Sequence, residues 1–358
     1  MQPLRVSALA LLLLPSLPRA GEPPRPYPPP AEVKAAFLRL LDRPRVPLNV
    51  RRQGPRREGG LVFEHLSFAS ERKAGGQEER VFALLVRPEK VAGKLPAVVV
   101  LHGTGGTKEG QRAWLIDLAR RGLIAVAIDA RYHGERAGGA RGAAAYNEAI
   151  VRAWRSKPPQ PQEHPFYFDT VWDVWRTLDY LQTRPDVDPD RLGLIGFSMG
   201  GIETWLAGSV DGRVRVAVPA IAVQSFRWGL ENDRWQGRAG TIRAAHEAAA
   251  KDLGEDRVTA RVCRALWDKV IPGLRDRFDC PSMIRLFAGR PLLILNGADD
   301  PNCPLGGARQ AFAAAEQAYR EAGASDRLQI LVARGVGHRV TAGQRQAALA
   351  WLERWLKP

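Results

Sequence analysis

The segment Arg191–Gly201 reads RLGLIGFSMGG, and it joins an apolar run to a helical pattern through GFSMG at 196–200. A Gly-x-Ser-x-Gly sequence between a strand and a helix is typical of the nucleophile elbow, a sharp turn that lifts the serine hydroxyl above a sheet. Glycines flank the serine because a Cβ there would collide with neighbouring backbone. The segment therefore predicts a nucleophilic serine, Ser198, at the carboxyl end of a parallel strand.

Apolar runs alternate with helical stretches on both sides of this elbow, as expected for parallel strands that are covered on both faces. The expected strands are 96–101, 124–128, 192–195, 214–218, 291–295 and 328–332, and the expected helices are 31–41, 111–121, 168–184, 199–207, 307–322 and 342–355. Leu61–Ala69 and Val81–Val86 predict a preceding hairpin. The predicted fold class is α/β: an α/β-hydrolase fold with a mostly parallel central sheet, helices on both faces and a helical cap insertion.

The cap is expected between Ala220 and Gly289, an interval too long for a single crossover. Helical patterns at 241–253 and 258–274 predict that it lies over the carboxyl edge of the sheet. Tryptophans can line an acyl or alcohol pocket or pack inside the cap, and both roles stay open for Trp228, Trp235 and Trp267.

A serine hydroxyl becomes a nucleophile when a base takes its proton and a third group orients that base. The strand expected at 291–295 leads into GADDP, where Asp300 is predicted to be the acid and Asp299 a solvated or loop-capping carboxylate. GVGH follows the last expected strand and supplies His338 as the base. The chain order Ser198, Asp300, His338 is that of α/β-hydrolases, and the chemistry needs no metal or organic cofactor.

The oxyanion hole is predicted to consist of the backbone N–H group of Met199 and that of Thr104 or its neighbour. Thr104 lies in the glycine-rich turn HGTGG at 102–106, directly after an expected strand. This turn lacks the lysine and Ser/Thr of a phosphate-binding loop. We expect His102 to orient the turn by hydrogen bonding and not to transfer protons.

These motifs together resemble the dienelactone-hydrolase and acetyl-xylan-esterase branch of the α/β-hydrolases, which is similar to the prolyl oligopeptidase catalytic domain. The resemblance spans about residues 60–356 and rests on HGTGG (102–106), DARYHGER (129–136), GFSMGG (196–201), GADDPNCP (297–304) and GVGH (335–338). It implies hydrolysis of a small-molecule or carbohydrate ester. Asp129 and Arg131 are expected to be structural. The serine and the cap differ from dienelactone hydrolases proper, which have a cysteine nucleophile and no long cap, so lactone hydrolysis of that kind is not expected.

The chain is basic, with 53 Lys and Arg against 38 Asp and Glu among 358 residues. The basic residues are mostly arginines scattered along the whole length, whereas a nucleic-acid-binding surface gathers them into a stripe with interleaved aromatic residues. No nucleic-acid partner is therefore expected. An Arg-rich envelope- or nucleic-acid-binding module is the alternative, and it predicts strong, salt-sensitive binding.

The amino terminus has Arg5 followed by an apolar run, Val6–Leu14, which is too short to cross a bilayer. It predicts a signal peptide over 1–20, a Pro-rich linker over 21–30 and an α/β-hydrolase domain over 31–358. We therefore expect a secreted or periplasmic protein without a membrane span. The chain has three cysteines, which show no metal-ligand spacing, and whether Cys263 and Cys280 pair is left open.

The function predicted from the sequence is hydrolysis of carboxylic esters through a Ser-His-Asp triad and an acyl-enzyme intermediate. A serine peptidase or amidase of the prolyl oligopeptidase type is one alternative, because the same triad cleaves amides. A catalytically silent binding protein with the same fold is the other.

Overall fold

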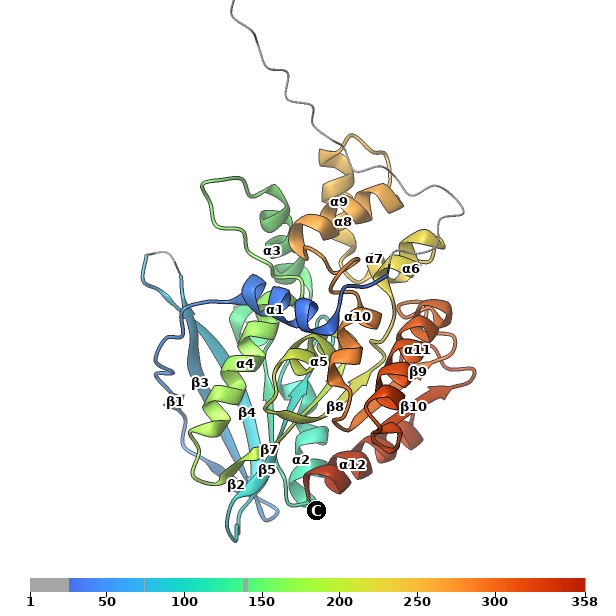
Figure 1. Cartoon of the computed structure of the whole chain (residues 1–358). Helices are drawn as coiled ribbons and strands as arrows, with labels where there is room; N and C mark the ends of the chain where they lie inside the picture. The colour runs from blue at the N-terminus through green and yellow to red at the C-terminus, as the bar shows by residue number, and fades with distance from the viewer. Residues whose placement is uncertain (1–25, 74, 138–140, 358) are drawn as a thin grey trace, which may run out of the picture.

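A computed structural model describes residues 26–73, 75–137 and 141–357, and a ten-stranded sheet with helices on both faces forms its centre (Figure 1). The strand order is β1-β3-β4-β6-β5-β7-β8-β9-β10, with β2 paired to β3. The strands are β1 (Arg51–Arg52), β2 (Arg56–Glu58), β3 (Leu61–Arg72), β4 (Glu78–Pro88), β5 (Leu95–Leu101), β6 (Ile124–Ile128), β7 (Val187–Phe197), β8 (Val214–Ala220), β9 (Leu292–Gly297) and β10 (Leu328–Ala333). The six strands from β5 to β10 are parallel, and β1–β4 are antiparallel, which confirms the predicted fold class.

Helices fill most of the connections between these strands. The α-helices are α1 (Pro30–Leu41), α2 (Arg112–Arg120), α3 (Ala144–Arg155), α4 (Phe168–Gln182), α5 (Met199–Val210), α6 (Phe226–Glu231), α7 (Gln236–Gly240), α8 (Arg243–Asp252), α9 (Ala260–Val270), α10 (Cys280–Ile284), α11 (Leu305–Glu321) and α12 (Ala342–Leu356). Short 3₁₀ turns are η1 (Glu109–Gln111), η2 (Gly134–Ala137), η3 (Arg285–Phe287) and η4 (Ser325–Arg327).

The parallel strands are apolar throughout because helices cover both of their faces. In β5, Val98 and Val100 pack with residues of α2 and α12 on one face. The alternate residues, Val99 and Leu101, pack with α1, α4 and α5 on the other. This alternation explains why a strand of a covered parallel sheet reads as an uninterrupted hydrophobic run.

Helix α1 starts at Pro30, the last residue of the predicted linker, and proline is favoured at the first position of a helix. Val33, Phe37 and Leu41 bury one face of α1 against the core, as the spacing predicts. The predicted signal peptide lies outside the described residues. Within the described ranges, no helix is both long and apolar enough to span a bilayer.

The helices between β8 and β9 belong to two regions. Helices α8 and α9 project beyond the sheet, whereas α10 packs back against α5 in the body (Figure 1). Helix α3, which lies between β6 and α4, packs on both projecting helices. In its contact with α8, Asn147 Oδ1 accepts the Ala245 N–H at 3.2 Å, and Arg155 pairs with Asp252 at 2.8 Å. We call α3 together with α6–α9 the cap. It therefore consists of two chain segments, where a single insertion was expected.

Candidate active site

Ser198 lies at the elbow between β7 and α5 with a φ of 54°, a conformation that a non-glycine residue rarely adopts. The close packing of its neighbours holds the turn. A Cβ on Gly196 would lie 2.1 Å from the Gly200 carbonyl oxygen, and one on Gly200 would lie 2.5 Å from the Leu101 carbonyl oxygen. These contacts are the physical reason for the two glycines, and they place the serine at the carboxyl edge of the sheet.

The structure brings Ser198, His338 and Asp300 into one chain of hydrogen bonds. His338 Nε2 lies 2.7 Å from Ser198 Oγ, and His338 Nδ1 lies 2.8 Å from Asp300 Oδ2. Asp300 is 2% exposed, and its Oδ1 accepts the N–H groups of Asn302 and Cys303 at 2.8 and 3.2 Å. The buried carboxylate therefore favours the imidazole tautomer that carries its proton on Nδ1, which leaves Nε2 free to accept the serine proton. The adjacent Asp299 is exposed.

The turn after β5 lies against the nucleophile. The Gly200 N–H, at the start of α5, donates to the His102 carbonyl at 3.1 Å, and a Cβ on Gly103 would lie 3.5 Å from Ser198 Cβ. Thr104 follows in the same turn and is half-buried. Met199 is the first residue of α5, so its backbone N–H has no carbonyl partner within the helix. This arrangement suits the predicted oxyanion donors, Met199 and Thr104, whose role stays a prediction.

His102 bridges two loops with both of its ring nitrogens. Nδ1 lies 2.8 Å from the Gly103 carbonyl, and Nε2 accepts the Ala130 N–H at 3.1 Å. Burial lowers the pKa of His102, so the ring is neutral. A neutral imidazole whose two nitrogens are both engaged holds the turn in place, which is the role expected from the sequence.

The DARYHGER segment holds the backbone that follows the HGTGG turn. Buried Asp129 accepts the Lys108 N–H at 2.8 Å and the Glu135 N–H at 3.1 Å, and it pairs with Lys108 Nζ at 3.0 Å. A Cβ on Gly134 would lie 2.3 Å from Asp129 Cγ. The carboxylate therefore fills the loop and fixes the backbone after β6, as the structural role predicted for Asp129 requires.

Arg131 belongs to a buried ion-pair network centred on Asp173 of α4. Arg131 Nε and Nη2 donate to the two carboxylate oxygens of Asp173 at 2.7 and 3.0 Å, and Arg136 Nη1 donates to Oδ2 at 2.7 Å. Burial alone would raise the pKa of Asp173, but the two guanidinium charges outweigh it and hold the pKa well below its usual range. This role of Asp173 is not evident from the sequence, because a charged residue in a helical pattern is ordinarily solvated.

The loop that carries Asp300 contacts the cap through α7. Arg238 Nη2 donates to the Asn302 carbonyl at 3.0 Å, and a Cβ on Gly237 would lie 2.1 Å from the Pro301 carbonyl oxygen.

Asp300, Cys303 and His338 offer ligand atoms within 4.8 Å of one another. However, His338 Nδ1 and both oxygens of Asp300 are already hydrogen-bonded, and burial raises the pKa of the Cys303 thiol far above its usual range. The group therefore suits proton transfer better than metal binding.

The tryptophans of the cap differ in their contacts. Trp267 is buried, its ring centroid lies 5.5 Å from that of Phe226, and its Nε1 donates to His246 Nε2 at 3.0 Å, so it packs inside the cap. Half-buried Trp228 covers Gly306 so closely that a Cβ there would lie 2.2 Å from its ring. Trp235 is half-buried, and its Nε1 donates to Asp233 at 2.8 Å.

All three cysteines are buried and free, including Cys263 and Cys280, whose pairing the sequence did not decide.

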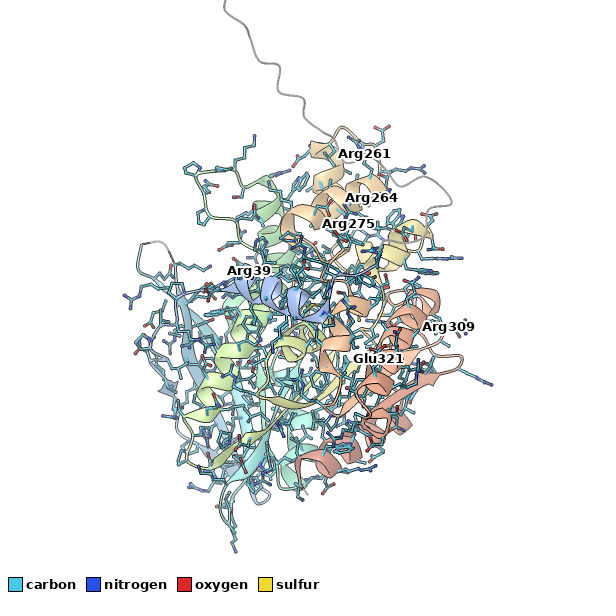
Figure 2. The ribbon with its side chains drawn as sticks, in the orientation of Figure 1. Arg39, Arg261, Arg264, Arg275, Arg309 and Glu321 are labelled. Carbon is cyan, nitrogen blue, oxygen red and sulfur yellow. The ribbon has the colours of Figure 1, made fainter. Side chains whose placement is uncertain are left out.

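Surface arginines extend from several separate elements. Figure 2 shows Arg39 on α1, Arg261 on α9 and Arg309 on α11, and all three are exposed.

A cavity of about 460 Å³ lies between α1, α4 and the turn before β8, at the end of α5 far from Ser198. It contains none of the predicted catalytic residues.

Comparisons with known proteins agree with this geometry. Residues 65–225 match the family model of the acetyl xylan esterases (AXE1). The Bacillus subtilis protein YtaP, named as a hydrolase, is 27% identical over 291 residues, which is 78% of this chain and 84% of YtaP. Acetyl xylan esterase 1 from Thermoanaerobacterium sp. JW/SL YS485 superposes with a TM-score of 0.64 at 17% identity, over 93% of this chain and 96% of that chain. The glucuronoyl esterase from Solibacter usitatus gives a TM-score of 0.62 at 16% identity, over 92% of each chain. The solved structures confirm the predicted fold, and the family-model match over residues 65–225 agrees with the predicted branch.

Proposed function

We propose that this chain is a serine hydrolase of carboxylic esters and a member of the acetyl xylan esterase branch of the α/β-hydrolase superfamily. The observation that carries the proposal is the hydrogen-bond chain from Ser198 through His338 to buried Asp300, with distances of 2.7 and 2.8 Å. The matches to acetyl xylan and glucuronoyl esterases support an ester as the bond that is cleaved.

In the proposed reaction, His338 takes the proton of Ser198 as the hydroxyl oxygen attacks the ester carbonyl. Asp300 stabilises the resulting imidazolium, and the N–H groups of Met199 and Thr104 bind the oxyanion. His338 then protonates the leaving alcohol, and a water molecule repeats the sequence on the acyl-enzyme. The strained backbone at Ser198 supports this assignment, because such strain is common at nucleophile elbows.

A fluorophosphonate probe with peptide mapping tests the nucleophile, and p-nitrophenyl esters of increasing acyl length test the reaction. We expect labelling at Ser198 and ester turnover, both lost in Ser198→Ala without loss of the folded state. Ser209→Ala is the matched control, because Ser209 is a buried serine in α5, the helix that begins directly after Ser198. Full turnover by Ser198→Ala would refute the assignment.

The same experiment separates the alternatives. Faster turnover of aminoacyl p-nitroanilides than of esters would favour a peptidase or amidase, which the triad alone does not exclude. Folded protein that neither reacts with the probe nor cleaves either substrate would favour a binding protein.

The finer proposals are a small-molecule or carbohydrate ester as substrate and a secreted or periplasmic location. The first is supported by the acetyl xylan esterase match, and the second by Arg5 and the apolar run Val6–Leu14 in the sequence. Release of acid from acetylated xylan, measured by titration, tests the substrate class. Amino-terminal sequencing of the exported protein tests removal of residues 1–20.

A further inference from the structure

The peptide group between Asn302 and Cys303 joins the proposed catalytic acid to the cap. Its N–H donates to Asp300 Oδ1 at 3.2 Å, and its carbonyl accepts from Arg238 Nη2 at 3.0 Å. The same nitrogen lies 3.3 Å from the Asp300 carbonyl oxygen, so both oxygens that it faces belong to Asp300. Because a trans peptide is planar, its N–H and C=O point in opposite directions, and the bond on one side helps to set the direction of the other.

Arg238 holds the same loop at a second point. Its Nη2 also lies 3.4 Å from Cys303 Sγ, and this thiol in turn donates to the Ile221 carbonyl at 3.2 Å. The preceding residue, Gly237, approaches the Pro301 carbonyl so closely that a Cβ there would lie 2.1 Å from the oxygen. Helix α7 therefore lies directly against the backbone of 301–303, the residues that follow the acid.

The guanidinium of Arg238 is part of the protein interior. Arg238 is 2% exposed, and its Cζ lies 5.7 Å from the centroid of the Phe226 ring. Within residues 26–73, 75–137 and 141–357, no carboxylate forms an ion pair with it. Burial acts to lower the pKa of Arg238, but the hydroxyl of Tyr167 and the groups of the acid loop outweigh burial and raise it, so the side chain is charged. A buried cation without an ion-pair partner is costly, so its position against the acid loop calls for an explanation.

We propose that Arg238 is a positioning residue for the catalytic acid, which it orients through the peptide group between Asn302 and Cys303. A cation on the carbonyl of this peptide strengthens its N–H as a donor to Asp300, since hydrogen bonds in series polarise one another. The proposal rests on the ester hydrolase function, and it makes the triad depend on a residue of the cap.

The role of Asp300 in the reaction predicts which kinetic constant depends on Arg238. Asp300 stabilises the imidazolium of His338, which forms only as the reaction proceeds and not when the substrate binds. A poorly oriented Asp300 therefore slows the chemical step more than it weakens substrate binding. Loss of Arg238 should lower kcat and leave KM nearly unchanged.

Arg238→Met removes the charge and the donors but keeps an unbranched side chain in the buried space. For p-nitrophenyl acetate, we expect kcat to fall by about tenfold to a hundredfold and KM to change by less than about threefold. Arg238→Lys keeps a charged donor without the guanidinium fork, so it should recover part of the lost kcat. Arg176→Met is the matched control, because Arg176 is a buried arginine of α4 that donates to Asp179 and the Val46 carbonyl outside the active site. It should leave kcat unchanged.

A double-mutant cycle with Asp300→Asn separates this role from a general loosening of the cap. The residual kcat of Asp300→Asn, corrected for the rate of Ser198→Ala, no longer depends on an oriented carboxylate. Adding Arg238→Met to it should therefore lower kcat by less than about threefold. Rates are normalised to the fraction of each protein that a fluorophosphonate labels at completion, so that unfolded protein does not count. If Arg238→Met does not fold, the smaller loss in Arg238→Lys is compared in the same two backgrounds.

Equal losses of kcat with and without the Asp300 carboxylate would overturn the positioning role and leave the ester hydrolase function standing. A kcat of Arg238→Met equal to that of the wild type would do the same. A wild type that neither turns over esters nor is labelled at Ser198 would overturn both proposals.

Discussion

Acid should destabilise the cap through one buried histidine, His246 of α8. The side chain is fully buried, its Nδ1 lies 3.2 Å from the Ile242 carbonyl, and its Nε2 accepts the Trp267 indole N–H at 3.0 Å. Burial lowers the pKa of His246 from its ordinary value of 6.5 to about 4. A proton on Nε2 would replace the acceptor with a second donor facing Trp267, and so would break the contact between α8 and α9.

The magnitude follows from proton linkage. Between pH 6.5 and 4, the unfolded chain binds a proton at His246 that the folded protein does not bind. The stability contributed by neutral His246 is therefore complete above pH 6.5 and is lost as the pH falls towards 4. At about 1.4 kcal/mol per pH unit, the free energy of unfolding should fall by about 3 kcal/mol over this window because of His246 alone.

Urea unfolding followed by tryptophan fluorescence at pH 7.5 and pH 4.5 measures this loss. His246→Gln keeps an acceptor for the Trp267 indole but does not titrate, so the wild type should lose about 2–3 kcal/mol more than the variant between the two pH values. Groups common to both proteins cancel in the difference. His65→Gln changes a histidine whose side chain is 38% exposed, and it should lose as much as the wild type. Equal losses in the wild type and His246→Gln would refute the reasoning.

Three substitutions test other parts of the structure. Asp300→Asn should lower kcat by about a thousandfold to ten-thousandfold with little change in Tm, because an amide favours the wrong imidazole tautomer; a near-normal kcat would contradict the triad. Asp173→Asn leaves Arg131 and Arg136 without their shared charge and should lower the free energy of unfolding by about 3–5 kcal/mol in urea titrations, and a loss below 1 kcal/mol would contradict a buried pairing. Gly200→Ala places a Cβ 2.5 Å from a strand carbonyl oxygen, so calorimetry should show a clear fall in Tm, whereas an unchanged Tm would mean that the elbow has room to relax.

Much of the fold could be predicted because its determinants are local. The elbow at 196–200 depends on a strand, a turn and a helix that are adjacent in sequence, and the alternation of apolar runs identified the other parallel strands. The sequence also contains the signal that ends α9, but the helix was predicted to run past it. The helix expected over 258–274 stops at Val270, just before Pro272 and Gly273, which terminate helices.

The contribution of α3 to the cap and the buried charges could not be predicted in this way, because they depend on contacts between distant segments. Helix α3 packs on α8 and α9, about a hundred residues later, and no local periodicity encodes that pairing. Asp173 and Glu203 occupy helical positions that would be solvated on an isolated helix. Their burial follows from neighbouring elements that cover α4 and α5, and no pattern within either helix indicates it.

The contact between α7 and the catalytic-acid loop limits how this protein can be recombined. Arg238 and Gly237 fit against the carbonyls of Asn302 and Pro301, although the two segments lie on opposite sides of β9 in the sequence. A chimera that exchanged the cap for that of a relative would therefore also change the support of Asp300. Cap and acid loop should be transplanted as one module, and directed evolution of substrate preference is expected to select paired changes in the two segments.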